Sequence, residues 1–234
     1  WAARHGFWAD WVVNPSPDAS ESTYKPLKRR PATKLLLGPM YAPLRSSFVR
    51  ERASLPRLTN VRRVLVCFGG GDDRGAIVFC LKTLAEADAG IQVVVMTSSS
   101  NPSLPDVIDT TKTVRNLEVE LLVDNESVAS ELLRSAVAIV SGGTLSLEAA
   151  AMGVPSFIIQ IAENQAANAT GWERLGAAID LGVLSEVRPE RLRSELVSLI
   201  ADANRRQSMS AAGFAAVDGK GAERIAATLV TGGI

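Results

Sequence analysis

Two glycine turns in this sequence have the composition of anion-binding sites. The first, Gly69–Gly71 with Asp72, follows the apolar run Val64–Cys67 and precedes a helical pattern. The second, Gly142-Gly143-Thr144, again stands between an apolar run and a helical pattern. Glycine lets the backbone turn sharply and brings main-chain N–H groups close to a ligand. The helix that follows adds the partial positive charge of its N-terminus, which suits a phosphate. A tight turn with nothing bound fits the first motif equally well.

A carboxylate follows the second turn at helical spacing. Glu148 stands four residues after Thr144, so both lie on one face of the predicted helix, about one turn apart. A carboxylate in that place can accept hydrogen bonds from both hydroxyls of a ribose. The alternative is that Thr144 is a helix N-cap and Glu148 a solvated helix residue.

A third polar cluster, Glu163-Asn164-Gln165, follows the apolar run that ends at Ile161. Open α/β sheets bind their ligands at the carboxyl ends of the strands, which is where this cluster is expected. The alternative is an N-cap at Asn164 with Gln165 on the surface. Three such segments would share one rim of the sheet, and this favours a common binding site.

The elements that must position these segments alternate between short apolar runs and longer helical patterns, which predicts an α/β fold with a doubly wound parallel sheet. Runs such as Val64–Val66 and Val93–Val95 suit strands covered on both faces. We predict strands at residues 9–13, 34–37, 63–68, 91–96, 117–123, 137–141, 156–161 and 177–181. We predict helices at residues 41–53, 74–87, 105–114, 127–134, 145–152, 165–175, 189–201, 203–216 and 222–230.

The chain is expected to divide near residues 55–60, where Pro56 and polar residues follow a charged helix. Residues 56–234 form a coherent β-α-β series. Residues 1–55 hold at most two strands, too few for an independent α/β domain, and we expect them to be the end of another domain.

Composition excludes several classes of function. Lys+Arg and Asp+Glu balance at 25 each, which disfavours binding to nucleic acid or to an anionic membrane. No apolar run reaches the length of a membrane span, and the first residues do not form a signal peptide, so a cytoplasmic location is expected. Oligomeric state cannot be predicted from these features.

No metal site or cofactor is expected. Cys67 and Cys80 stand in apolar contexts and are predicted to be buried thiols, and His5 is the one histidine. The acidic pair Asp72-Asp73 is adjacent rather than spaced, and a helix N-cap is its simpler role.

Together these segments resemble nucleotide-sugar enzymes of the GT-B architecture, in which two Rossmann-like domains face each other. The strongest resemblance is to the hydrolase of pseudaminic acid biosynthesis, which removes UDP from a deoxy amino sugar, and to spore-coat polysaccharide proteins. A looser resemblance reaches the glycosyltransferase that completes lipid II. The matching segments are 36–45 with Phe48, 67–72, 141–148, 153–155, 162–165 and 218–222.

The resemblance implies a role for each matching segment. Gly143, Thr144 and Leu145 would meet the diphosphate, and Glu148 the ribose. Gly142 would belong to the same nucleotide-binding turn. Leu122 and Val123 would offer backbone groups to uracil. Gly70 and Gly71 would line the cleft, and Asp72, Glu163, Asn164 and Gln165 would lie near the sugar.

The sequence departs from the family in one respect. It has no glycine-rich turn with the histidine that the family places in its N-terminal domain, and His5 precedes a strand that resembles the end of that domain. The catalytic residue is therefore unknown.

Three functions fit these features. The main expectation is hydrolysis of a UDP-sugar, the second is glycosyl transfer from a UDP-sugar, and the third is a non-catalytic nucleotide-sugar-binding subunit.

Overall fold

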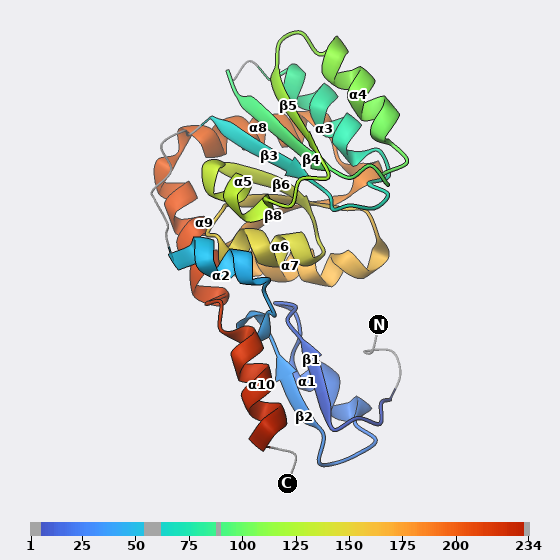
Figure 1. Cartoon of the computed structure of the whole chain (residues 1–234), viewed down its shortest axis with the longest axis vertical. Helices are drawn as coiled ribbons and strands as arrows, with labels where there is room; N and C mark the ends of the chain where they lie inside the picture. Colours follow the sequence, from blue (N-terminus) through green and yellow to red (C-terminus); the bar gives the residue numbers. More distant parts are fainter. Residues whose placement is uncertain (1–5, 54–61, 88–89, 232–234) are drawn as a thin grey trace.

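The computed structural model describes residues 6–53, 62–87 and 90–231. They form a six-stranded α/β domain and, below it in Figure 1, a smaller part that we call the N-terminal lobe (residues 6–41). The C-terminal helix leaves the domain and lies beside this lobe.

The domain is built on one parallel sheet with the strand order β5-β4-β3-β6-β7-β8. The order reverses between β3 and β6, the first and fourth strands of the sheet along the chain, so a crevice opens at their carboxyl ends. Both glycine turns lie at this place. The strands are β3 (Arg63–Cys67), β4 (Gln92–Thr97), β5 (Glu118–Val123), β6 (Val137–Ser141), β7 (Ser156–Gln160) and β8 (Ala178–Val183).

Helices cover both faces of the sheet, and each face has its own apolar core. This explains why β3, β6 and β7 are buried at every residue. One face carries α3 (Ala76–Ala85), α4 (Leu104–Thr113) and α8 (Pro189–Ala201). The other carries α2 (Ser46–Ala53), α5 (Val128–Arg134), α6 (Thr144–Ala151) and α7 (Ala166–Arg174), while α9 (Ala203–Ala216) packs against α6 and α8.

The N-terminal lobe contains two parallel strands, β1 (Trp11–Asn14) and β2 (Lys34–Leu37). Its short helical segments are α1 (Glu21–Tyr24), η2 (Lys25–Leu27) and η3 (Pro39–Tyr41). Two further turns in the domain are η4 (Glu163–Gln165) and η5 (Leu184–Glu186).

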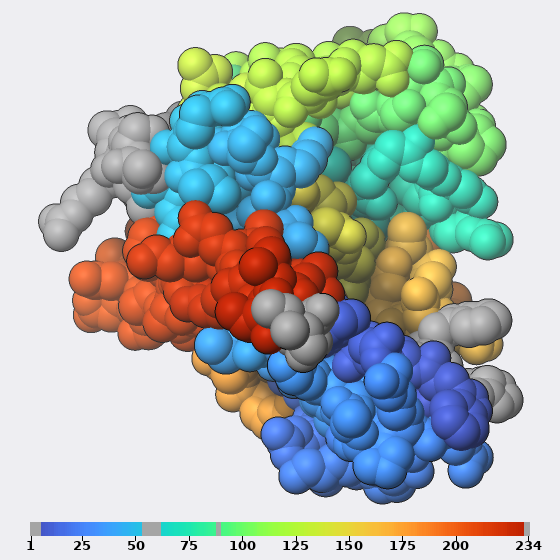
Figure 2. Space-filling model, turned by 60° about the horizontal axis from the view of Figure 1, so that its bottom comes forward, coloured from blue at the N-terminus to red at the C-terminus, as the bar shows by residue number. Residues whose placement is uncertain are grey.

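Helix α10 (Gly221–Thr231) joins the C-terminal end of the chain to the N-terminal lobe. Gly221 packs so tightly against the backbone of Ala42 that a Cβ atom at this position would overlap it. The Arg224 guanidinium donates a hydrogen bond to the Met40 carbonyl and pairs with Asp218. Figure 2 shows α10 and the N-terminal lobe side by side on one face.

The predicted doubly wound parallel sheet is confirmed, and each predicted strand is present with ends that differ by no more than two residues. The helix predicted at 41–53 begins only at Ser46. Pro43 accounts for the interruption at Ala42, which is extended with a ψ angle of 116°, because proline disfavours helical backbone in the residue before it. Helix α3 begins at Ala76, since Arg74 and Gly75 have positive φ angles of 57° and 79°.

Both cysteines are free thiols in the core, as predicted. Helix α2, which the sequence assigned to the first region, packs against α5 and α6 of the domain. The predicted boundary near residues 55–60 and the residue His5 lie outside the described residues.

Candidate functional site

Two cavities lie on either side of the second glycine turn. The switch-point cavity, with a volume of about 440 Å³, lies at the carboxyl ends of β3, β4 and β5 and against α6. The interlobe cavity, of about 340 Å³, lies between the N-terminal lobe and the domain. Of the predicted site residues, the switch-point cavity brings together Gly70, Thr144, Leu145 and Glu148. The interlobe cavity brings together Gly142, Gly143 and Asn164.

Helix α6 places Thr144 and Glu148 in the same cavity. Gly143 is the N-cap residue and Thr144 the first helical residue, so the alternative of Thr144 as the N-cap is wrong. The first amides of an α-helix have no partner within the helix and carry its positive dipole end. Glu148 lies one turn further along and lines the cavity as well. The arrangement matches the spacing predicted from the sequence.

The Glu148 side chain is buried rather than solvated, since only 7% of its surface is exposed. Its Oε1 atom accepts a hydrogen bond of 3.0 Å from Nη2 of Arg45, which is 55% exposed. Burial raises the pKa of the Glu148 carboxyl, and the Arg45 charge acts against that rise. The alternative of a solvated helix residue is therefore wrong.

The rim of the switch-point cavity is formed by the loops after β4 and β5. Leu122 and Val123 end β5 beside the cavity, and the next residue, Asp124, lines it. Asp124 has a φ angle of 53°, a left-handed conformation that aspartate tolerates better than most residues. Its carboxylate accepts a hydrogen bond of 2.9 Å from the Ser99 amide, which lowers the pKa of Asp124.

Cys67 forms part of the cavity wall at the end of β3. Burial raises the pKa of its thiol to about 11, so the thiol is protonated at neutral pH. Cys67 therefore contributes an apolar surface to the cavity rather than a nucleophile.

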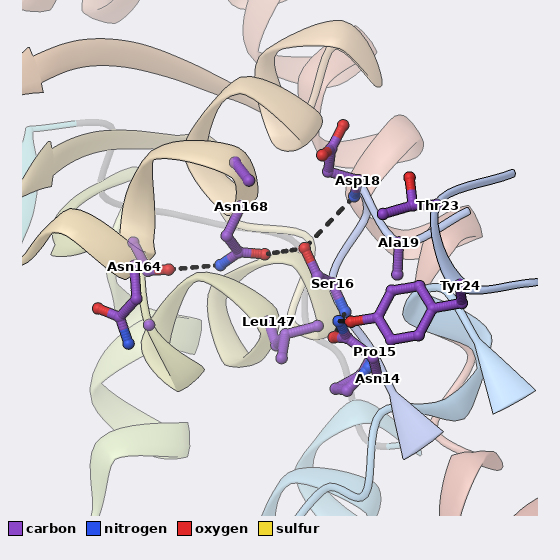
Figure 3. A pocket seen from close by; sticks show the side chains of 13 residues that line it. Asn14, Pro15, Ser16, Asp18, Ala19, Thr23, Tyr24, Leu147, Asn164 and Asn168 are labelled. Carbon is purple, nitrogen blue, oxygen red and sulfur yellow. Dashed lines mark hydrogen bonds between the residues drawn. The ribbon is translucent and has the colours of Figure 1, made fainter. Parts of the chain in front are cut away.

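The walls of the interlobe cavity combine apolar surface with polar groups that are almost all uncharged (Figure 3). On the N-terminal side these come from Asn14, Ser16 and Thr23, and on the domain side from Asn164 and Asn168. The one carboxylate in its wall, Asp18, pairs with Arg174 at 2.9 Å. Such a surface suits a neutral, hydroxyl-rich ligand better than an anion.

Asn168 of α7 connects the two parts of the molecule. Its amide nitrogen donates to the Gly142 carbonyl and to Oγ of Ser146, and its amide oxygen accepts from Oγ of Ser16 at 3.3 Å. Figure 3 shows Ser16 and Asn168 pointing toward each other and joined by this hydrogen bond. The loop after β1 is thereby tied to the second glycine turn.

The Gln165 side chain fixes the second glycine turn by hydrogen bonds. Its Oε1 atom accepts hydrogen bonds from the amides of Gly142 at 3.2 Å and Ile161 at 3.0 Å. Asn164 makes no N-cap hydrogen bond, and the N-cap position of α7 is Gln165 itself. The alternative of an Asn164 cap with a surface Gln165 is therefore wrong. Glu163 is exposed at the start of η4.

The first glycine turn is more open. Gly70 lines the switch-point cavity, whereas Gly71 is exposed and lies outside both cavities. Asp72 accepts a hydrogen bond from the Arg74 amide and pairs with the Arg74 side chain. Asp73 is fully buried and accepts from the amide of Ile77 in α3 at 2.8 Å, so it stabilises the start of the helix.

Within residues 6–53, 62–87 and 90–231, no three His, Cys, Asp or Glu side chains are grouped as a metal site would require. The helices of this part of the chain are also too short or too polar to cross a bilayer.

No family model matches the sequence. The spore coat polysaccharide biosynthesis protein SpsG of Bacillus subtilis (strain 168) is 28% identical over 202 residues, which are 84% of this chain and 58% of that protein. The chain therefore spans less than two thirds of this curated relative.

Solved structures share the fold. MurG of Acinetobacter baumannii matches with a TM-score of 0.66 at 17% identity, over 92% of this chain and 64% of that one. The chain has a GT-B-like α/β fold. The UDP-GlcNAc 2-epimerase of Neisseria meningitidis, solved with UDP-GlcNAc, matches at 0.63 and 16% identity, over 95% and 61% of the two chains. The spinosyn rhamnosyltransferase SpnG, solved with thymidine diphosphate, matches at 0.56 and 17% identity, over 91% and 52%.

The structure adds residues to which the sequence assigned no role. Arg45, Asp124 and Asn125 line the switch-point cavity, and Ser16 and Asn168 line the interlobe cavity. Arg45 belongs to the segment 36–45 that carried the resemblance. No local pattern, however, places it opposite Glu148, 103 residues further along the chain.

Proposed function

We propose that this chain is the nucleotide-binding part of a glycosyltransferase that uses a UDP-sugar in polysaccharide biosynthesis. The similarity to SpsG supports a role in polysaccharide biosynthesis. The GT-B-like fold, shared with a rhamnosyltransferase, supports glycosyl transfer as the reaction. The chain spans 58% of SpsG, so we propose the activity for the whole protein and the nucleotide site for these residues.

One observation carries the proposal: Thr144 and Glu148 line the same cavity at the point where the strand order reverses. The ionised Glu148 carboxylate has two oxygens, and a ribose has two adjacent hydroxyls that can donate to them. Glu148 lies one helical turn from the amides that start α6, about 5 Å along the helix axis. This is the spacing at which a ribose and its attached phosphate can be held together.

The diphosphate would lie at the N-terminus of α6, against the amides of Gly143, Thr144 and Leu145. These amides and the helix dipole would stabilise the negative charge that develops as the bond to the sugar breaks. This supplies leaving-group stabilisation from the protein itself. A residue that activates the acceptor is not assigned.

The base and the sugar would extend in opposite directions from this point. The pyrimidine would reach the end of β5, where Leu122 and Val123 present backbone groups beside the cavity. The sugar would enter the interlobe cavity, near Asn164 in its wall and Glu163 beside it in sequence. The uncharged polar groups of this cavity suit hydroxyl groups.

Hydrolysis of the UDP-sugar is the second candidate, supported by the likeness of segments 36–45 and 162–165 to the hydrolase of pseudaminic acid biosynthesis. Both reactions need the same leaving-group site and differ in whether water or an acceptor hydroxyl attacks the anomeric carbon. A non-catalytic nucleotide-sugar-binding subunit would use the same site without the reaction.

Calorimetric titration of the chain with UDP, and with CMP and ADP as controls, tests the nucleotide site. We expect saturable binding without added metal and a preference for UDP. Equal binding of the three nucleotides would contradict the assignment of the base. No binding of UDP by the whole enzyme would overturn the proposal.

Product analysis of the whole enzyme with a UDP-sugar then separates the reactions. Release of UDP and free sugar in water would support hydrolysis, and release that requires an acceptor would support transfer. Binding of the UDP-sugar without release would support the non-catalytic subunit.

A further inference from the structure

Arg45 is the one cationic residue among the described residues that line the two cavities. The switch-point cavity also contains three carboxylates, Asp124, Glu126 and Glu148. A nucleoside diphosphate that enters this cavity brings further negative charge. The balance of charge therefore makes the position of the Arg45 guanidinium decisive for binding.

This guanidinium is paired with the carboxylate assigned to the ribose. Nη2 of Arg45 lies 3.0 Å from Oε1 of Glu148 and so occupies a place that a ribose hydroxyl would take. The two side chains are held unequally. Glu148 is 7% exposed on a core helix, whereas Arg45 is 55% exposed and packs over the Phe48 ring at 5.0 Å. Arg45 is therefore the partner that can move.

We propose that Arg45 and Glu148 exchange partners when the nucleotide binds. The ribose hydroxyls replace the guanidinium on Glu148, and the guanidinium turns toward the diphosphate at the start of α6. This inference rests on the proposed function and makes Arg45 a residue that binds the diphosphate. Both residues line one cavity, so the exchange requires rotation of a side chain and no movement of the sheet.

The exchange gives the site a means of selecting nucleotides over nucleosides. A nucleoside must break the ion pair and leaves the guanidinium without a new anion. A nucleoside diphosphate breaks the same pair and supplies the anion, which can form charge-assisted hydrogen bonds with Arg45. Burial of Glu148 strengthens this dependence, because a buried carboxylate that loses its cation needs other donors.

The affinities of UDP and uridine for the wild type and the variant Arg45→Gln test the exchange. We expect the variant to bind UDP at least about tenfold more weakly and uridine at least as tightly as the wild type, because uridine no longer has to displace the guanidinium. Arg45→Lys should restore most of the UDP affinity, since it keeps the charge. Arg205→Gln is the matched control, because Arg205 pairs with Glu195 at the same 3.0 Å in α8 and α9, away from both cavities.

The outcomes are distinct. An equal loss of UDP and uridine affinity would show that Arg45 only orders Glu148, and unchanged UDP affinity would show that it does not meet the diphosphate; either result overturns the exchange. If wild type binds neither ligand, the proposed function fails and the exchange fails with it. A wild type that binds UDP leaves the proposed function standing whatever the variant does.

The double variant Arg45→Gln/Glu148→Gln keeps the test available if the single variant does not fold. It removes the buried charge together with its partner, so Glu148 is not left ionised and alone. We expect the advantage of UDP over uridine to be at least about tenfold smaller in the double variant than in the wild type, with the remainder supplied by the amides that start α6. A UDP advantage as large as in the wild type would contradict the exchange.

Discussion

The two glycine turns occupy equivalent places after the neighbouring strands β3 and β6, yet they are built differently. A Cβ atom at Gly142 would lie 2.9 Å from Cβ of Gln165 and 3.3 Å from Cγ2 of Ile158. At Gly69 and Gly71, by contrast, a Cβ atom would meet nothing within 4 Å. Neighbouring side chains thus pack closely against the second turn at Gly142, whereas the space beside Gly69 and Gly71 in the first turn is open.

The difference separates two reasons for a glycine. Gly142 is needed because neighbouring side chains fill the space that a side chain would take. Gly69 is needed because its φ angle of 98° is a conformation that other residues rarely adopt. Gly143 combines open space with a place at the start of α6, since a Cβ atom there would meet only Oγ of Ser141, at 3.8 Å. A side chain at Gly143 would therefore test the ligand rather than the fold.

The largest effect is expected for Gly142→Val. The side chain would collide with Gln165 and break the hydrogen bond from the Gly142 amide, and overpacking of this kind costs about 3 kcal/mol. Urea denaturation followed by circular dichroism would measure the free energy of unfolding. A stability within about 0.5 kcal/mol of wild type would contradict the packed description of this turn.

Gly143→Val should leave the stability nearly unchanged and weaken UDP binding by about 30-fold, or about 2 kcal/mol. The reason is that the side chain would occupy the place where the phosphate approaches the first amides of α6. Calorimetric titration with UDP gives the affinity, with Gly142→Val as the comparison for fold and binding. If Gly143→Val binds UDP as tightly as wild type, the phosphate lies elsewhere.

Replacing Glu148 by glutamine should weaken UDP binding by about tenfold at neutral pH, and this difference should shrink as the pH falls. Burial raises the pKa of Glu148, so its ionised form, which receives the ribose, is lost as the pH falls through that raised value. The effect of Glu148 on stability runs in the opposite direction. Its pKa is higher in the folded than in the unfolded protein, so it stabilises the fold below its unfolded pKa, and this contribution is lost as the pH rises through its folded pKa.

Titration of wild type and Glu148→Gln with UDP, from neutral pH toward about pH 5, isolates this carboxylate. The phosphate of UDP titrates equally in both experiments, and glutamine does not titrate. We expect the ratio of the two affinities to be largest at neutral pH and to approach one in acid. A ratio that is constant with pH would remove Glu148 from the ribose site.

The smallest effect is expected for Gly71→Ala. The methyl group enters open space, so we expect the UDP affinity to change by less than about twofold and the free energy of unfolding to stay nearly unchanged. Calorimetric titration with UDP at neutral pH measures the affinity. A loss of more than tenfold would show that the first turn touches the ligand closely, and the contrast between the two turns would then disappear.

The sequence predicted the fold well because the strands that carry it are continuous apolar runs. Val64–Val66 and Val93–Val95 lie in β3 and β4, two neighbouring strands of the sheet. The pattern failed where a local steric effect decided the boundary, as at Pro43 before α2. The short helix α1 was also missed, since four residues are too few for a periodicity.

The site was predictable only in its local parts. Thr144 and Glu148 share a cavity because helical spacing places them on one face. The contacts of Gln165 with Gly142 and of Arg45 with Glu148 join residues 23 and 103 positions apart. Such contacts depend on the order of strands in the sheet, which no short pattern in the sequence contains.

The contact between Gly221 and Ala42 has a mechanical consequence. The chain passes between the N-terminal lobe and the domain at residues 39–44 and again near residues 217–221, and this contact brings the two crossings together. A second attachment lies where the loop after β1 meets α7, through the ion pair of Asp18 with Arg174 and the hydrogen bond of Ser16 with Asn168. The lobe is therefore held to the domain at two separate places, and the walls of the interlobe cavity keep their spacing only while both attachments are intact.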